Sequence, residues 1–373
     1  MDSKCLMLPS KAANKNRWID RASALVRVGA IGAIIITGLS MMHHDAATEH
    51  DVATIVTTAA ASPLAPVSPP LCTKTLPAGG DLAAFSISLA PGDVACLALG
   101  AVYVVDTIYM EVGGTAAQPI ILTSADPATP ATIRGRLVTN PGANYITISD
   151  LRLDGINVNN WPSITIGSDH ITLMHNDVMN EHTAVCINTI NDLIYGIAHD
   201  TLIDANRIHD CGALPATNLQ HGLYLMGYRA TVTNNYIYNN ADRGVQLRGS
   251  QDSVIEHNVI DGNGEGVIFG DLSASMNKVA YNVISNSRLR FNAESWWTSV
   301  PVGTGNTLHD NCFWSTRTDA YGSGGGVAPK LSGVVVGTKT VAAPLYMNPS
   351  TGDYRLQTGS ACASYGPAGH PGP

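Results

Sequence analysis

The chain has few aromatic and few charged side chains. Phe, Trp and Tyr together make up 6% of its 373 residues, and Asp, Glu, Lys and Arg make up 13%. A mainly helical protein would carry many Glu and Lys residues on its surface, so this composition argues against that class. The formal net charge is −8, and no basic stripe offsets it. A nucleic-acid partner is therefore not expected.

Two short chemical motifs are also absent. No C-x-x-C pair occurs, so a zinc site is not expected. No G-x-S-x-G turn occurs either, which gives no support to Ser-His-Asp catalysis. Glycine is abundant, with 36 residues, and 45% of the chain is hydrophobic. This balance favours a β protein that is punctuated by Gly and Asn and has a sizeable core.

The N-terminal part reads as a membrane or export segment. Residues 1–23 are basic, residues 24–42 form an apolar run interrupted only by Arg27, and residues 43–75 are rich in Ala, Thr, Ser and Pro. The run is just long enough to span a bilayer, with the basic tail on the cytoplasmic side. The alternative is a signal peptide cleaved near the small residues at 58–61. Both readings place the rest of the chain outside, either held at the cell membrane through residues 24–42 or secreted, after a disordered linker.

Six cysteines lie after the apolar run. An even number in an oxidising compartment suggests disulfides. Proximity in the sequence favours three pairs, which are Cys72–Cys96, Cys186–Cys211 and Cys312–Cys362. Six cysteines allow fifteen connectivities, so other pairings remain open.

A repeat runs through the middle of the chain. It places Asn between two apolar residues, at −3 and +2, in segments such as "VTNNYI" and "IEHNVI". The repeated Asn residues are Asn176, Asn206, Asn235, Asn258, Asn282 and Asn311. "YITISDL" fits the same frame with Ser149 in the Asn position. Spacings of 23–30 residues without a helical pattern predict a solenoid of about eight to ten coils. The Asn residues are expected to bond to one another along a turn and to tolerate its left-handed geometry.

These segments resemble a known group. "ITISDLRLDG", "HGLYL", "NNYIYNN" and "EHNVIDGNGEGVIFG" resemble the right-handed parallel β-helix repeats of the pectate-lyase-like superfamily, in its exported bacterial members. The segment from Ser88 resembles the entry to the first coil, and the segment from Tyr346 resembles a closing segment. The resemblance implies an all-β, single-stranded right-handed parallel β-helix over residues 76–366. It indicates the fold more specifically than the function, because the superfamily includes lyases, hydrolases, epimerases and proteins without known activity.

The candidate site residues are predicted at outward-facing positions of neighbouring coils. Aligning "TAVCIN", "HGLYLM", "RGVQLR" and "EGVIFG" puts His221, Arg243 and Glu265 in one column, and Tyr224 and Gln246 in the next, followed by Arg248. A lyase for uronic acids needs a cation for the carboxylate and a base for the adjacent proton. Arg243 or Arg248 fits the first role, His221 the second, and Tyr224 that of proton donor. The alternative is a surface ion pair between Arg243 and Glu265, with His221 capping a turn.

Aromatic residues flank this surface. An insertion at residues 288–306 carries Trp296 and Trp297, which are candidates for stacking on sugar rings, together with Gln246 and Glu265 as substrate-binding residues. The alternative is that the tryptophans cover the edge of the solenoid. A second insertion, at residues 211–220, directly precedes His221.

Several related chemistries fit the sequence less well. "RGVQLRGSQDS" resembles the arginine strand of alginate epimerases and puts Arg248 at the matching position, but the preceding strand lacks their Asp-Pro-His. Paired Asp residues, which polygalacturonase-type hydrolysis uses, do not occur in the repeats. Carboxylates such as Asp150, Asp154 and Asp242 are scattered, so we expect no cofactor and leave only calcium open.

Two function classes follow. The first is a polysaccharide lyase or related enzyme for acidic glycans, with His221, Tyr224, Arg243 and Arg248 as its catalytic residues. The second is a non-catalytic surface module that binds glycan or wall material. In both, the expected partner is a polysaccharide.

Overall fold

The computed structural model describes residues 71–157, 159–270, 274–296 and 301–367. The predicted basic tail, the apolar segment at 24–42 and nearly all of the linker lie outside these residues, and so does Trp297. Within the described part of the chain, no helix is long and apolar enough to cross a membrane.

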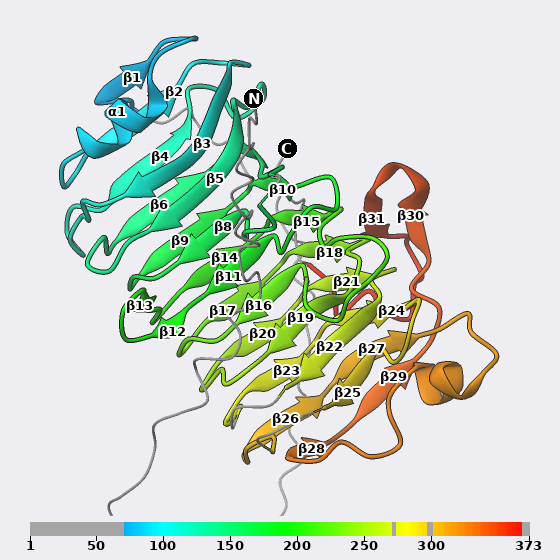
Figure 1. Ribbon diagram of the computed structural model, residues 1–373. Coiled ribbons are helices and arrows are strands. Elements are labelled where there is room, and N and C mark those ends of the chain that lie inside the picture. The colour runs from blue at the N-terminus through cyan, green and yellow to red at the C-terminus, as the bar shows by residue number, and fades with distance from the viewer. Residues whose placement is uncertain (1–70, 158, 271–273, 297–300, 368–373) are drawn as a thin grey trace, which may run out of the picture. The chain divides into compact units, whose positions relative to one another are not determined.

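The described residues form a right-handed parallel β-solenoid of about nine turns (Figure 1), which confirms the predicted fold. Each turn contributes short strands to three faces. The first face is a parallel sheet of β1 (Lys74–Leu76), β2 (Val94–Leu97), β4 (Ile120–Ser124), β6 (Ile146–Ser149), β9 (Ile171–Met174), β14 (Leu202–Asp204), β17 (Thr231–Thr233), β20 (Val254–Glu256), β23 (Lys278–Ala280), β26 (Asn306–His309) and β28 (Val334–Val336).

The other two faces share the long strand β5 (Thr132–Thr139), which also pairs with β3 (Val102–Met110). The second face continues from the end of β5 through β8 (Ile164–Ile166), β11 (Ile187–Thr189), β16 (Leu223–Leu225), β19 (Arg243–Leu247), β22 (Glu265–Phe269) and β25 (Ala293–Ser295). The third face continues from the start of β5 through β7 (Arg152–Asp154), β10 (Asp177–Met179), β15 (Arg207–His209), β18 (Tyr236–Tyr238), β21 (Val259–Asp261), β24 (Val283–Ser285), β27 (Asn311–Trp314) and β29 (Lys339–Val341).

The core is made of the apolar residues that the repeat placed on either side of each Asn. In each repeat, the residue at position −3 from the Asn and the residue at position +2 are at most 1% exposed. These positions run from Leu173 and Val178 in the first repeat to Leu308 and Phe313 in the last. Because equivalent residues of successive coils stack directly on one another, a single repeated position becomes a continuous buried column.

The Asn column forms a continuous ladder between the first and third faces. The side-chain Nδ2 of each Asn donates to Oδ1 of the next, at 2.9–3.0 Å, from Asn176 to Asn311. Backbone N–H groups donate to the same oxygens. The left-handed residue of this turn is the one before each Asn, with φ between 50° and 57°. The expectation that the Asn itself takes that geometry is therefore wrong.

Two alignments made from the sequence are displaced by two residues. Ser149 pairs with Met174, and it is Leu151 whose backbone N–H donates to Asn176 Oδ1 at 3.1 Å. Likewise, Ile187 pairs with Leu223, so Asn188 stands beside Tyr224 where the alignment had placed Cys186. The period-2 alternation of strands hides such slips, because a shift of two keeps every side chain on the same face.

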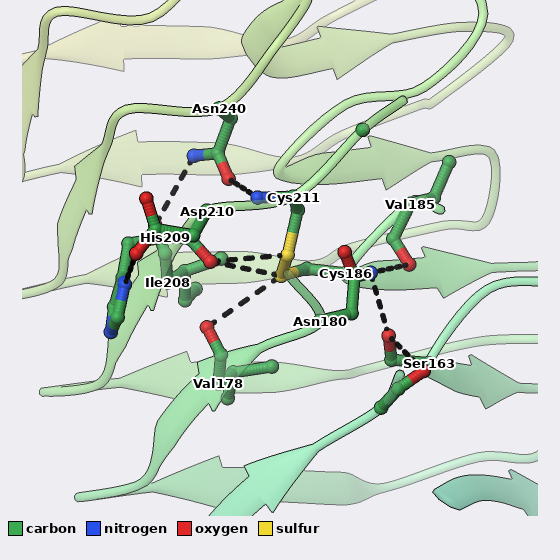
Figure 2. The surroundings of a disulfide bond; sticks show 12 residues. Ser163, Val178, Asn180, Val185, Cys186, Ile208, His209, Asp210, Cys211 and Asn240 are labelled. Atoms are coloured by element: carbon green, nitrogen blue, oxygen red, sulfur yellow. Dashed lines mark hydrogen bonds and ion pairs between the residues drawn. A yellow bond between two sulfur atoms is a disulfide. The ribbon is translucent and has the colours of Figure 1, made fainter. Parts of the chain in front are cut away.

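Three disulfides join the predicted pairs, Cys72–Cys96, Cys186–Cys211 and Cys312–Cys362. Figure 2 shows Cys186 and Cys211 linking two neighbouring coils, with Asn240 Oδ1 accepting from the backbone N–H of Cys211 at 3.1 Å. The first disulfide lies beside β1, which begins at Lys74, two residues before the expected start of the solenoid.

A few elements stand outside the coils. Helix α1 (Leu82–Ile87) is capped by the Asp81 side chain, which accepts from the backbone N–H of Ala84. A small hairpin, β12 (Asn191–Asp192) and β13 (Gly196–Ile197), extends one corner. The 3₁₀ segments are η2 (Ala320–Gly325) and η3 (Pro349–Thr351), and the C-terminal hairpin is formed by β30 (Tyr346–Asn348) and β31 (Asp353–Leu356).

Candidate functional site

The candidate residues lie on the second face, where β16, β19, β22 and β25 run side by side. Leu223, Val245, Val267 and Ala293 pair in register and point into the core. The next position in each strand is occupied by Tyr224, Gln246, Ile268 and Glu294. The predicted register of β16, β19 and β22 is confirmed.

Tyr224 and Arg248 form the half-buried part of the site. Arg248 Nη1 donates to Tyr224 Oη at 2.7 Å. The ring of His221 meets the ring of Tyr224 edge-on, with centroids 5.1 Å apart. A guanidinium and a phenol oxygen are thereby held in one fixed arrangement on the second face.

His221 itself is buried, with 1% of its surface exposed. Burial, together with the nearby charges of Arg243 and Arg248, holds the pKa of the imidazole well below its usual range. Its Nδ1 accepts from the backbone N–H of Arg243 at 3.5 Å. The expectation that His221 is an exposed base in a groove is therefore wrong, because a neutral, covered imidazole positions its neighbours and does not face solvent.

Arg243 and Glu265 are also buried. Their side chains are 5% and 2% exposed, with 3.3 Å between Arg243 Nε and Glu265 Oε2. The expected pairing is present, but it is not the surface ion pair considered from the sequence. Arg243 also donates from Nη1 to the carbonyl of Asn218 at 3.1 Å and lies 5.3 Å from the centroid of the Trp296 ring.

A second carboxylate, that of Glu294, completes this cluster. Glu294 is 4% exposed, and Arg290 contacts it through two hydrogen bonds of 2.9 and 2.8 Å. Burial raises the pKa of Glu265 to about 7; Arg243 opposes the rise, while the charge and hydrogen bond of Glu294 add to it. Glu265 therefore keeps its proton at mildly acidic pH and loses it as the pH rises through about 7.

The loop at residues 211–220 is fixed over this cluster. The Asp242 carboxylate accepts from the backbone N–H groups of Asn218, Leu219 and Gln220 at 2.8–2.9 Å. The same loop supplies the Asn218 carbonyl to Arg243. The loop and Trp296, which is 39% exposed, therefore make the outer layer of the site.

Gln246 is covered rather than available to a ligand. It is 3% exposed, and its Oε1 has no hydrogen-bond partner. Its amide lies against Gly270, where an added Cβ would come within 2.0 Å of Nε2. The expectation that Gln246 and Glu265 present exposed binding groups is not met in this arrangement.

Sequence reasoning missed Glu294, Arg290 and Asp242. Extending the strand alignment to "FNAESW" would have placed Glu294 beside Ile268, but residues 288–306 were treated as an insertion. Asp242 lies directly before Arg243, and nothing in its local sequence signals that it anchors a loop. Among the described residues, no group of three or more His, Cys, Asp or Glu side chains is arranged to hold a metal ion.

Fold and register define a right-handed parallel β-helix protein. The chain belongs to the family described as "Right handed beta helix region", whose model matches residues 137–328. No curated protein sequence matches the chain.

Solved structures share the architecture. The pectate lyase Pel9A has a TM-score of 0.53 and 14% identity, with 78% of this chain and 91% of the enzyme covered. An alginate lyase from Paenibacillus sp. str. FPU-7 has a TM-score of 0.48 and 16% identity, with 73% and 100% covered. The A-module of the mannuronan C-5 epimerase AlgE4 from Azotobacter vinelandii has a TM-score of 0.42 and 13% identity, with 67% and 87% covered. At these identities the likeness to Pel9A shows the fold alone.

Proposed function

We propose that this β-helix protein acts on an acidic polysaccharide as a lyase, with the polymer lying over the second face at β16 and β19. The Tyr224–Arg248 pair is the observation that carries the proposal. It places a cation 2.7 Å from a phenol oxygen on a half-buried part of the second face. The pectate and alginate lyases with similar folds make the substrate class a reasonable one to test.

The proposed reaction is elimination beside a uronate carboxylate. Arg248 binds that carboxylate and offsets the negative charge that develops when the neighbouring carbon loses its proton. Tyr224, reacting as the phenolate beside Arg248, accepts that proton at Oη, the bond to the leaving sugar oxygen breaks, and a carbon–carbon double bond forms. The Tyr224 phenol then gives the proton to the leaving oxygen. His221 orients the Tyr224 ring from below, as a positioning residue.

A non-catalytic glycan-binding module is the second candidate. It is favoured by the burial of His221, Gln246 and Glu265, so that Tyr224, Arg248 and Trp296 are the predicted site residues in the described part of the chain that can contact a polymer. In that case the buried ionic cluster holds the loop at 211–220 and does no chemistry.

Activity assays separate the two candidates. We expect the exported protein to release unsaturated products, detected by ultraviolet absorbance, from at least one polyuronate. Tyr224→Phe keeps the ring contact with His221 but removes the phenol oxygen, so turnover should fall by roughly 10²–10⁴-fold. Tyr109→Phe, at a Tyr that is 47% exposed, serves as the matched control. Polymer binding without product would favour the module, and full turnover by Tyr224→Phe would refute the proposed site.

We further propose that the folded domain lies outside the cytoplasm. The three disulfides support export, because such bonds persist in oxidising compartments. Residues 24–42 then act as an anchor or as a cleaved signal. Mass spectrometry of the exported protein distinguishes an intact N-terminus from one that starts near residue 62.

A further inference from the structure

A polar cleft lies on the third face, away from the Tyr224–Arg248 pair. It has a volume of about 570 Å³ and is bounded by β15 and β18 on one side and by η3 on the other. Figure 1 shows the hairpin of β30 and β31 standing beside this part of the third face. We call it the hairpin cleft; the lining residues used below are Arg207, His209, Tyr238, Asn239, Arg288 and Tyr354.

Stacked rings form a rigid inner wall of the hairpin cleft. His209 stacks on Tyr238, with centroids 4.7 Å apart and the planes 5° from parallel. Tyr238 contacts Tyr354 of the hairpin at 4.6 Å. Arg207 Nη2 donates to Tyr238 Oη at 2.7 Å. Gly352, at φ 76°, lies so close that an added Cβ would come within 2.6 Å of Arg207 Nη2. The hairpin is therefore fitted closely against the coil.

The carboxylates of the cleft are already engaged. Asp177 accepts from His209 Nε2 at 2.8 Å and from Arg152 Nε at 3.2 Å. Asp210 accepts from His209 Nδ1 at 2.7 Å. Burial alone lowers the pKa of His209, but the hydrogen bonds to Asp177 and Asp210 outweigh it and raise the pKa overall. A protonated His209 therefore offsets the negative charges of Asp177 and Asp210, which leaves these carboxylates paired inside the inner wall of the cleft.

Arg288, another cation of the cleft, donates to neutral acceptors, and the Asp210 carboxylate acts on it through its charge from a longer distance. Its Nη1 donates to Asn239 Oδ1 at 3.0 Å and its Nη2 to the Asn240 carbonyl at 2.8 Å, both neutral acceptors. In the described part of the chain, no carboxylate lies within 4.0 Å of its guanidinium. Two neutral partners thus hold an exposed guanidinium in place at the edge of a polar cleft.

We propose that the hairpin cleft binds one carboxylated sugar residue. The carboxylate contacts Arg288, and the sugar hydroxyls contact Asn239 and the exposed hydroxyls of Ser350 and Thr351 at the hairpin turn. A fixed guanidinium suits a planar carboxylate, and a cleft of this volume is large enough for a small ligand. The choice of a uronate rests on the proposed function, but the cleft is separate from the Tyr224–Arg248 pair, so it binds this sugar whether or not the second face is catalytic.

Titration of the full exported protein with galacturonate, followed calorimetrically, tests the inference. We expect saturable binding that Arg288→Gln weakens at least about tenfold, because a hydrogen bond to a charged group is lost. Arg134→Gln, which changes a half-exposed guanidinium on β5, is the matched control. Arg288 also donates to the backbone carbonyl of Asn240, so its removal could change the local structure. A double variant, Ser350→Ala with Thr351→Ala, changes two exposed side chains and provides an independent test. We expect it to weaken galacturonate affinity several-fold.

Other probes distinguish a sugar site from a simple anion site. Galactose should bind far more weakly than galacturonate, and sulfate should not displace galacturonate at equal concentration. Equal binding of sulfate, or no saturable binding of galacturonate, would overturn the inference. Arg288→Gln should leave polyuronate turnover unchanged, and Tyr224→Phe should leave galacturonate binding unchanged. Failure of the cleft and failure of the lyase proposal therefore give different results.

Discussion

At the scale of single residues, burial decides what each ionisable group can do. The alternating pattern placed His221, Arg243 and Glu265 together, and the structure brings them into contact. The same pattern could not show that Asn218 and Trp296 cover them. Tyr224 and Arg248 are therefore the residues proposed to contact a polymer. The buried groups position these two side chains and stabilise the fold.

The raised pKa of Glu265 makes stability depend on pH. The pKa of Glu265 is raised from 4.5 to about 7 in the folded protein. The folded state therefore binds more protons than the unfolded state between these values, and stability falls as the pH rises through about 7. Relative to Glu265→Gln, the wild-type protein should lose up to about 3 kcal/mol of unfolding free energy between pH 4.5 and 8.

Thermal unfolding of both proteins across this pH range checks the Glu265 prediction. Glu111→Gln, at an exposed position, should follow the wild-type curve at every pH. A constant difference between wild type and Glu265→Gln would mean that Glu265 carries no extra proton.

At the scale of elements, the Asn ladder adds side-chain hydrogen bonds between coils to the backbone pairing of the parallel strands. Each Asn side chain satisfies backbone groups of the preceding turn, and from Asn176 to Asn282 its amide also donates to the Asn side chain of the following turn. Asn258, for example, donates to the carbonyls of Val232 and Glu256 and accepts from both the backbone and the side chain of Asn235.

Replacing a central rung should therefore be costly. Asn258→Ala leaves several buried donors and acceptors unpaired, each worth about 1–3 kcal/mol. We expect the melting temperature to fall by several degrees, with the β-sheet circular-dichroism spectrum preserved below the transition. Asn159→Ala, at an exposed site, should change the melting temperature little. Equal effects of the two substitutions would show that the ladder adds nothing to stability.

Particular residues show how far the sequence determines these elements. The Asn spacing predicted the solenoid and its core columns, and the proximity of the cysteines in the sequence predicted the disulfides. The two-residue slips at Ser149 and Cys186 arose because strands of equal polarity pattern fit either register. Glu294 was missed because a long corner preceded its strand, and long corners have no period of their own.

At the scale of the whole molecule, neighbouring coils contact mainly one another, so damage stays local. The Cys312–Cys362 disulfide joins β27 to the segment that follows the C-terminal hairpin. Tyr354 and Tyr346 of that hairpin pack with Cys312 and Cys362 in a small satellite cluster, separate from the main core.

Removing this bond should release the hairpin and spare the coils. In a Cys312→Ser, Cys362→Ser double variant, we expect proteolysis to cut first within residues 343–361 and galacturonate binding at the hairpin cleft to be lost. Turnover on the second face should persist. The variant in which Cys72 and Cys96 are both Ser is the control, because that bond lies at the other end of the solenoid. Loss of the whole fold in the first variant would contradict this view.

The 23-residue step from Asn235 to Asn258 has a consequence for how this chain can change length. A single residue added inside a strand would turn every following side chain to the opposite face, whereas a whole coil removed would leave each column intact. Residues added at a corner, as in the loop at 211–220, also leave the columns undisturbed. Insertions and deletions should therefore be tolerated in two forms, as entire coils or as residues in corner loops. Because the Tyr224–Arg248 pair and the hairpin cleft lie on the same coils, lineages of this chain would then differ in the number of coils on either side of these sites while keeping both whole.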